Sequence, residues 1–298
     1  MQYSRAMAFD VRDLVDEGSS AAVYRLPEKQ VLKLFRDGMA EELVRYEYDA
    51  ARFAHDLGIF VGRPVEMRRL DDRWGIIFED LERPTLRVEL NRKPLRQWAS
   101  LKALAERHAQ IHQHPGKDHL VFQRHALLRR IESAHVSDAL KCAALNVLDD
   151  LPVGDRLCHG DLHPGNAIMT GQGLAIIDWF KASIGHPATD IARTELLLRF
   201  AQYGVRLRHI PLLRVRRHVA AASYLRFYAK ASGLALNDIS HWRLPVGVAW
   251  LQGQDGIHED GLRKLLARLA RKHVEKAQNI LKIYVHLLPL PLIALQSC

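Results

Sequence analysis

The feature that most constrains this chain is a stretch rich in glycine, histidine and aspartate that leads into a short apolar run. Residues 158–166 read Cys-His-Gly-Asp-Leu-His-Pro-Gly-Asn, and residues 175–178 read Ala-Ile-Ile-Asp. Asp161 precedes Asn166 by five residues across a Pro-Gly turn, and Asp178 ends the apolar run twelve residues after Asn166. Oxygen ligands of this type suit a hard cation such as Mg²⁺, which usually keeps phosphates and waters in its coordination sphere. The spacing therefore indicates a metal site on tight turns beside buried strands.

Two other interpretations of these residues are open. In the first, Asp161, Asn166 and Asp178 do no more than cap turns, although their joint spacing argues against this. Alternatively, His159, Asp161 and His163 could bind a metal of their own, but that arrangement leaves Asn166 and Asp178 without a role. Taken alone, His159 is best interpreted as a buried histidine that hydrogen bonds to the backbone.

The first 80 residues have the pattern of a β-sheet interrupted by one helix. Strand-like runs cover residues 11–15, 21–26, 31–35, 64–69 and 74–78, with turn-prone residues between them. Residues 40–57 instead have helical spacing, and Gly58 is suited to end that helix. The spacing places five residues on one helix face: Leu43, Glu47, Ala50, Ala54 and Leu57.

Beyond Leu81 the pattern is mainly helical, except in residues 153–180. One predicted helix face after Pro94 consists of Leu95, Trp98, Leu101, Ala105, His108 and His112. No ligand is implied for its histidines. The apolar segment 280–295 contains Lys282, His286 and two prolines, which favours a C-terminal packing segment over a membrane anchor. A strand-rich part followed by a larger helical part predicts an α+β protein in two parts.

The motif His-Gly-Asp-Leu-His-Pro-Gly-Asn with the downstream Ile-Ile-Asp-Trp closely resembles the signature of the aminoglycoside phosphotransferase/choline kinase-like family, relatives of the protein kinases. The segment 185–193 resembles a further family motif. The resemblance spans residues 11 to about 195. It implies a protein-kinase-like bilobal fold, with a small N-lobe (1–80) of antiparallel sheet and one helix, and a mainly helical C-lobe (81–298) that binds the acceptor.

The resemblance also implies roles for the motif residues. Asp161 is expected to be the catalytic base that faces the acceptor hydroxyl, and Asn166 and Asp178 are expected to hold Mg²⁺. Asp190 is expected to support the catalytic loop. His163 stands where protein kinases carry a lysine, and both a role near the transferred phosphoryl group and a packing role are open for it.

The N-terminal part contains the residues that a nucleotide site of this family requires. Lys33, at the centre of residues 31–35, takes the place of the lysine that pairs with ATP phosphates. Glu47 is the one acid on the apolar helix face, so we expect an ion pair between it and Lys33. The backbone of Glu79 and Leu81 is expected to bind adenine. The loop over the phosphates has one glycine, with Ser19 and Ser20 as possible phosphate donors.

Composition excludes several classes of protein. Three cysteines without a CxxC spacing argue against a disulfide framework or a cysteine-based zinc site, and the N-terminus has no apolar signal sequence. We therefore expect a cytoplasmic protein.

Residues 201–298 hold 15 Lys/Arg against 5 Asp/Glu. No nucleic-acid-binding motif accompanies this positive charge, so we do not expect nucleic acid as a partner.

The function expected from the sequence is ATP- and Mg²⁺-dependent transfer of the γ-phosphate to a hydroxyl of a small molecule. A catalytically silent nucleotide-binding module of the same fold is an alternative, but none of the key residues is missing. A protein kinase is less favoured, because only about a dozen residues separate Asp178 from Asp190, too few for a peptide-docking segment. The basic last third favours a neutral or anionic acceptor. Neither the acceptor nor the oligomeric state can be deduced from the sequence.

Overall fold

The computed structural model describes residues 14–93, 96–201, 211–253 and 259–287, and the chain divides into two compact units. Unit 1 comprises Met1–Leu120 and Leu157–Ile184, and unit 2 comprises Val121–Arg156 and Gly185–Cys298. The chain changes unit at β6 (Arg156–Cys158) and β9 (Ser183–Gly185), which pair with each other. Unit 1 thus holds the N-terminal sheet together with the segment that carries Asp161. The lobe boundary at residue 80 stays a prediction.

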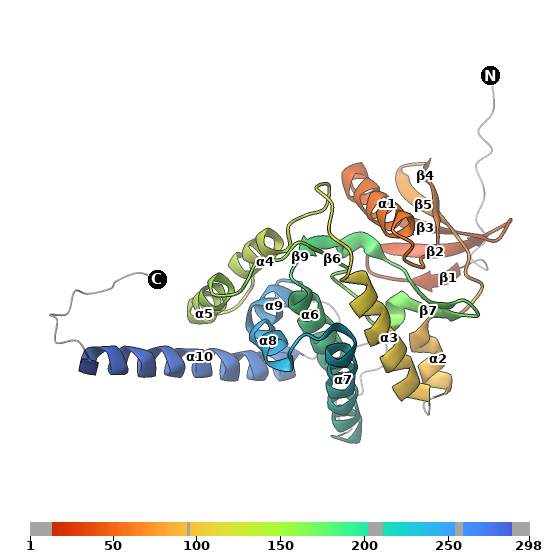
Figure 1. Ribbon diagram of the computed structural model, residues 1–298. Helices are drawn as coiled ribbons and strands as arrows, with labels where there is room; N and C mark the ends of the chain where they lie inside the picture. The colour runs from red at the N-terminus through yellow and green to blue at the C-terminus, as the bar shows by residue number, and fades with distance from the viewer. Residues whose placement is uncertain (1–13, 94–95, 202–210, 254–258, 288–298) are drawn as a thin grey trace. The chain divides into compact units, whose positions relative to one another are not determined.

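Unit 1 begins with a five-stranded antiparallel sheet in the order β1-β2-β3-β5-β4 (Figure 1). Its strands are β1 (Leu14–Glu17), β2 (Ala21–Leu26), β3 (Gln30–Phe35), β4 (Pro64–Leu70) and β5 (Arg73–Glu79). The four predicted strands from residue 21 to residue 78 are confirmed within a residue or two at each end. The first runs to Glu17, and residues 11–13 of its predicted range lie outside the described residues.

The alternation of side chains along β3 decides where Lys33 points. Leu32 and Leu34 join Ile77 in the apolar cluster on one face of the sheet, whereas Phe35 joins Ile76 in the cluster on the other. Because side chains two residues apart on a strand share a face, Lys33 lies on the same face as Phe35. This is the face against which the following helix packs.

That helix, α1 (Glu41–Asp56), confirms the helix predicted over residues 40–57, but its buried face is shifted by one residue. Leu43 is 47% exposed, and Val44 is fully buried in its place. The predicted and observed faces share Glu47, Ala50 and Ala54, so the phase error left the important acid correctly placed. A Schellman pattern ends the helix as expected: Gly58, at φ 76°, donates to His55 O, and Ile59 donates to Ala54 O.

The rest of unit 1 comprises α2 (Leu86–Arg92), α3 (Gln97–Ile111) and the segment that carries the motif. The face predicted for α3 is buried from Leu101 to His112, but Trp98 is 47% exposed, and Leu95 lies outside the described residues. The motif segment forms a 3-10 turn η3 (Pro164–Asn166), a hairpin of β7 (Ala167–Thr170) and β8 (Gly173–Ile176), and a second 3-10 turn η4 (Trp179–Lys181).

Unit 2 is helical in its described residues, which together with the sheet of unit 1 confirms the α+β class. It contains α4 (Gln123–Glu132), α5 (Asp138–Asp149), α6 (Pro187–Phe200), α7 (Pro211–Ser232), α8 (Leu236–His241), α9 (Arg243–Trp250) and α10 (Glu259–Leu287). Among the described helices, none combines the length and the apolar character that a membrane crossing requires. The packing predicted for residues 280–295 concerns side chains outside the described set.

Candidate active site

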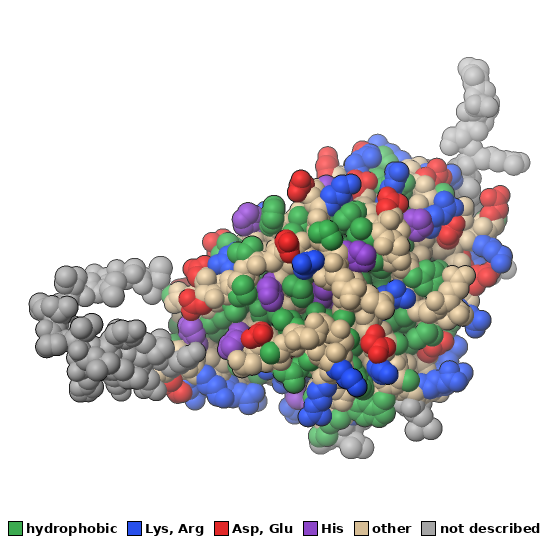
Figure 2. Space-filling model, viewed as in Figure 1, with side chains coloured by type: hydrophobic (Ala, Val, Ile, Leu, Met, Phe, Trp, Pro, Cys, Tyr) green, Lys and Arg blue, Asp and Glu red, His purple; other side chains and the backbone are tan. Residues whose placement is uncertain are grey.

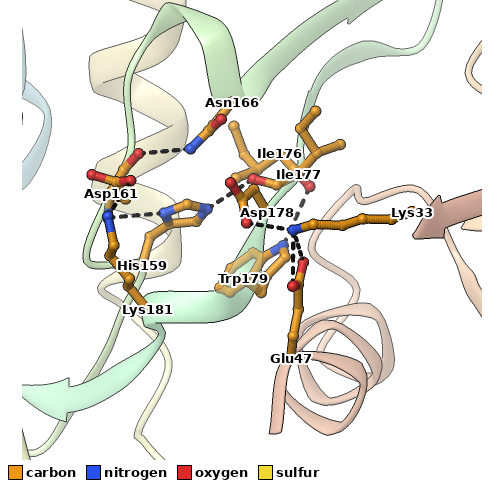
Figure 3. A network of polar contacts seen from close by, with 10 residues as sticks. All are labelled: Lys33, Glu47, His159, Asp161, Asn166, Ile176, Ile177, Asp178, Trp179 and Lys181. Carbon is orange, nitrogen blue, oxygen red and sulfur yellow. Dashed lines mark hydrogen bonds and ion pairs between the residues drawn. The ribbon is translucent and has the colours of Figure 1, made fainter. Parts of the chain in front are cut away.

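The Lys33 side chain lies between two carboxylates of unit 1 (Figure 3). Its Nζ is 2.6 and 2.8 Å from the two carboxylate oxygens of Glu47, so the predicted ion pair is present. The same Nζ is 2.7 Å from Asp178 Oδ1. The three side chains differ in exposure: 1% for Glu47, 13% for Lys33 and 39% for Asp178. The lysine is thus anchored on the buried side and reaches Asp178 on the open side.

Burial and charge act against each other on this group of side chains. Burial raises the pKa of Glu47 to about 7, in spite of the nearby Lys33 ammonium. Burial alone would lower the pKa of Lys33, but the carboxylates of Glu47 and Asp178 outweigh it and raise that pKa above its ordinary value. The Lys33 charge likewise overcomes burial at Asp178 and lowers the pKa of its carboxyl. Lys33 and Asp178 are therefore both charged at neutral pH.

The β7–β8 hairpin brings Asn166 and Asp178 together from twelve residues apart. Ala167 pairs with Ile176, and the Ile177 N–H donates to Asn166 O at 3.0 Å, so Asn166 lies opposite Ile177, the residue before Asp178, at the open end of the hairpin. Asp178 then has φ 66°, in the left-handed region. Aspartate tolerates this conformation better than most residues, but it is still strained, and such strain is typical of functional positions.

Asp161 is held by its backbone and by its carboxylate. Its N–H donates to His159 Nδ1, and its carbonyl accepts from Asn166 Nδ2 at 3.0 Å. Because His159 Nδ1 accepts, Nε2 carries the proton and donates to Ile177 O at 3.1 Å. The carboxylate Oδ2 of Asp161 lies 2.7 Å from Lys181 Nζ. The buried His159 therefore hydrogen bonds to the backbone, as predicted.

The donor atoms fit a hard cation at Asn166 and Asp178 and not at the histidines. Since Asn166 uses its amide nitrogen on Asp161, its amide oxygen is the atom left to accept, and Asp178 contributes a half-exposed carboxylate. Amide and carboxylate oxygens are ligands that Mg²⁺ accepts. The alternative site at His159, Asp161 and His163 does not fit, because both ring nitrogens of His159 already have backbone partners and His163 Nδ1 accepts from Gly165 N–H.

His163 caps the η3 turn through that bond from Gly165. Desolvation lowers the pKa of His163 to about 4, against which the negative charge of Asp161 acts only in part. The imidazole is therefore neutral at physiological pH. This favours the packing and capping role over a role in neutralising phosphate charge.

The remaining predicted site residues belong to unit 1 as well. Ser19 and Ser20 lie in the β1–β2 loop, whose backbone is held by Arg36, since the Arg36 N–H donates to Ser20 O and its guanidinium donates to Gly18 O. Glu79 ends β5, with its N–H donating to Arg63 O, and Leu81 follows two residues later. The nucleotide-binding roles of these four residues stay predictions. Asp190 is buried in the first turn of α6, in unit 2.

Two contacts of the motif segment were not foreseen from the sequence. Lys181 pairs with Asp161, and the Tyr46 hydroxyl on α1 donates to Ala182 O. Lys181 follows Asp161 by 20 residues. Nothing in its immediate sequence distinguishes it from a surface lysine. Tyr46 is adjacent to Glu47 but lies outside the helix face that the spacing predicted, so nothing in the sequence signalled its contact with Ala182.

Solved structures similar to this chain include two that are named as kinases. Amicoumacin kinase hAmiN, in complex with AMP-PNP, Ca²⁺ and Ami, is 17% identical with a TM-score of 0.57, and the match covers 90% of both chains. Choline kinase LicA from Streptococcus pneumoniae is 18% identical with a TM-score of 0.55, covering 89% of this chain and 92% of that one.

A third similar structure is the aminoglycoside phosphotransferase APH(3'')-Id from Streptomyces rimosus with ADP and streptomycin. It is 15% identical with a TM-score of 0.54, covering 76% of this chain and 90% of that one. At these identities the likeness is one of fold, and it confirms the expected kinase-like fold. Among curated proteins, none matches the chain.

A family model described as the phosphotransferase enzyme family matches residues 13–210. The match includes every residue to which the sequence assigned a role in nucleotide binding, metal binding or catalysis. Since it extends over more than half of the chain, the protein belongs to the phosphotransferase enzyme family.

Proposed function

We propose that this protein transfers the γ-phosphoryl group of ATP, in the presence of Mg²⁺, to a hydroxyl of a small molecule. The observation that carries the proposal is the position of Lys33 between Glu47 and Asp178. A buried carboxylate holds the ammonium in place, and a half-exposed carboxylate lies on its open side. This arrangement presents one fixed positive charge to phosphate oxygens next to an acid that can take a metal ion.

In this proposal, Lys33 binds the α- and β-phosphates, and the oxygens of Asn166 and Asp178 hold Mg²⁺. The ion supplies neutralisation of phosphate charge when it is bound. Ser19 and Ser20 contribute donors to the phosphates, and the backbone of Glu79 and Leu81 binds adenine. Most of catalysis in phosphoryl transfer is positioning and electrostatic stabilisation, which rigidly held side chains provide.

Asp161 orients the acceptor hydroxyl and accepts its proton. In the transfer, a bond forms between the acceptor oxygen and the γ-phosphorus, and the bond from that phosphorus to the β–γ bridging oxygen breaks. ADP leaves with the electron pair of the broken bond, and the acceptor proton passes to the Asp161 carboxylate. The hydrogen bonds from the Asp161 N–H to His159 and from Asn166 to the Asp161 carbonyl fix the backbone that carries this carboxylate, which supports the proposed role.

The acceptor that we propose is a neutral or anionic small molecule. Two similar structures are named amicoumacin kinase and choline kinase, and these names support a small molecule as the acceptor. In unit 2 the charge balance is strongly positive, with 15 Lys/Arg against 5 Asp/Glu in residues 201–298. Blue side chains gather along the lower edge of the face in Figure 2, where Figure 1 places α7 and α10. Such a surface disfavours polycationic acceptors.

Radiolabel transfer from Mg-[γ-³²P]ATP to a panel of hydroxylated compounds tests this function. The panel should contain sugars, amino alcohols, nucleosides, phosphorylated alcohols and aminoglycosides, with Asp161→Asn as the control protein. We expect transfer to a neutral or anionic member by the wild type and a large loss in the variant. Efficient transfer to aminoglycosides, with kcat/KM above about 10⁴ M⁻¹s⁻¹, would overturn the acceptor class and leave the phosphotransferase activity standing.

A further inference from the structure

Lys181 places an ammonium group on the proposed catalytic base, from a different part of the chain. It is the last residue of η4, and its Nζ is 2.7 Å from Asp161 Oδ2. The Lys181 side chain is 34% exposed and that of Asp161 is 16% exposed. The pair thus lies at the edge of the protein interior, where water does not fully screen it.

The backbone around Lys181 is fixed on several sides, so the pair is built into the fold. Gly160, at φ 78°, packs so closely that a Cβ there would overlap with the carbonyl oxygen of Lys181. The Tyr46 hydroxyl donates to Ala182 O. Phe180 packs on the apolar cluster of the sheet, with its ring centroid 6.3 Å from that of Phe35. These contacts fix the backbone of Lys181, which distinguishes it from a surface lysine on a loosely held loop.

The other charged and ring groups at this place have different partners. The Lys33 ammonium is turned to Glu47 and Asp178. His163 uses Nδ1 to accept the Gly165 N–H and so caps the turn. His159 joins the backbone of Asp161 to that of Ile177. The two histidines therefore hold the backbone, and Lys33 binds the carboxylates of Glu47 and Asp178. Lys181, by contrast, contacts the Asp161 carboxylate itself.

We infer that Lys181 is a positioning residue for the proposed phosphoryl transfer: its ammonium holds Asp161 Oδ2 and offsets the repulsion between that carboxylate and the γ-phosphoryl group. This inference rests on the proposed role of Asp161 as the base. Two negative groups must come together when an acceptor is poised between Asp161 and ATP, and a cation bound to one of them lowers the cost. Lys181 keeps its own protons throughout, since the acceptor proton goes to Asp161.

Single-turnover hydrolysis of Mg-[γ-³²P]ATP, with water as the acceptor, tests the inference without knowledge of the natural acceptor. The proteins compared are the wild type, Lys181→Met, Lys181→Arg, Asp161→Asn and the double variant of Asp161→Asn and Lys181→Met. The matched control is Lys102→Met, since Lys102 is an exposed lysine of α3 paired with Glu106. Calorimetry gives the Kd for Mg-ATP of each protein. If the Met variant does not fold, Lys181→Gln takes its place.

We expect Lys181→Met to slow hydrolysis at least about 30-fold while the Kd for Mg-ATP changes less than about threefold. Lys181→Arg should restore the rate to within about fivefold of the wild type, because it keeps the charge. The double variant should be no slower than Asp161→Asn within about threefold, since a residue that acts through Asp161 has nothing left to act on.

Three results would overturn the inference while the proposed function stands. The first is a hydrolysis rate of Lys181→Met equal to that of Lys102→Met, and the second is an equal loss of rate in Lys181→Met and Lys181→Arg. The third is a double variant whose loss of rate equals the product of the losses in the two single variants. A hydrolysis rate in Asp161→Asn equal to that of the wild type would instead overturn the role of Asp161, and the inference with it.

Discussion

Lys33 Nζ lies 2.7 Å from Asp178 Oδ1, although 145 residues separate the two in the sequence. The contact joins the centre of β3 to the residue that follows the β7–β8 hairpin. Since Lys33 also holds the buried Glu47, one ammonium group connects the sheet, helix α1 and the motif segment of unit 1 (Figure 3). Stability and nucleotide binding should therefore respond together to changes at this lysine.

Replacement of Lys33 by Met should destabilise the protein, because it leaves the Glu47 carboxylate buried without its cation. Breaking a buried ion pair costs about 3–5 kcal/mol, and uptake of a proton by Glu47 limits the loss. Burial raises the pKa of that carboxyl above its unfolded value, so the folded variant binds more protons and the destabilisation grows as the pH rises. Urea unfolding at about pH 6 and pH 8.5 measures both effects.

The double variant Lys33→Met with Glu47→Gln should recover at least half of the free energy of unfolding that Lys33→Met loses. Lys102→Met, at an exposed pair, controls for the loss of any lysine charge. Equal stability of Lys33→Met and Lys102→Met would show that the buried pair does not contribute as argued.

Gly160→Ala should lower stability more than Gly38→Ala does. Both glycines have positive φ, 78° and 77°, so both alanines carry the same backbone cost of about 1 kcal/mol. At Gly38 a Cβ would meet nothing within 4 Å, whereas at Gly160 it would overlap with the Lys181 backbone. The difference between the two free energies of unfolding therefore isolates the steric contact. Equal losses would mean that the close approach of Gly160 to Lys181 is absent in solution.

His163 should make the protein less stable as the pH falls from about 6.5 to about 4. Desolvation lowers the pKa of His163 to about 4, so the unfolded chain binds a proton in this range that the folded protein does not bind. The expected loss is at most about 3 kcal/mol. His163→Asn keeps a capping side chain but cannot titrate, so its melting temperature should fall less over this range. Parallel curves for the two proteins would refute the assignment.

Asp161→Asn should reduce the turnover of ATP about 10²–10⁴-fold, the usual contribution of a general base. The substitution keeps the backbone bonds to His159 and Asn166 and removes the charge opposite Lys181. Its affinity for Mg-ATP should remain close to that of the wild type, because Lys33 and Asp178 are untouched. A variant that loses nucleotide affinity instead would place Asp161 in binding and not in proton transfer.

The parts of the site that the sequence predicted are those set by local spacing. The five-residue separation of Asp161 from Asn166 and the apolar run before Asp178 predicted a tight turn beside short buried strands, and both are present; that the strands pair as a hairpin was not predicted. Glu47 was recognised because an acid on an apolar helix face is exceptional. The fold class followed from the change of hydrophobic period between the strand-rich and helix-rich parts.

What the sequence did not predict depends on packing between distant segments. The α1 face was placed on Leu43 and not on Val44, because spacings of three and four residues fit either phase, and only the sheet beneath decides. Trp98 was placed by its spacing on the same helix face as Leu101, which is buried, yet Trp98 is 47% exposed. Lys181 meets Asp161 through the contact of Gly160 with η4, which leaves no periodic signal.

The measurement that tests the central claim most directly is calorimetric titration of Mg-ATP into the wild type, Lys33→Met and Asp178→Ala, with Lys102→Met as the control. If Lys33, Asn166 and Asp178 form one nucleotide and metal site, the wild type and the control bind Mg-ATP with equal Kd. The two site variants then bind at least about tenfold more weakly, a loss of about 1.4 kcal/mol. Mg-ATP binding that is absent from the folded wild type, or unchanged in both site variants, would contradict the account.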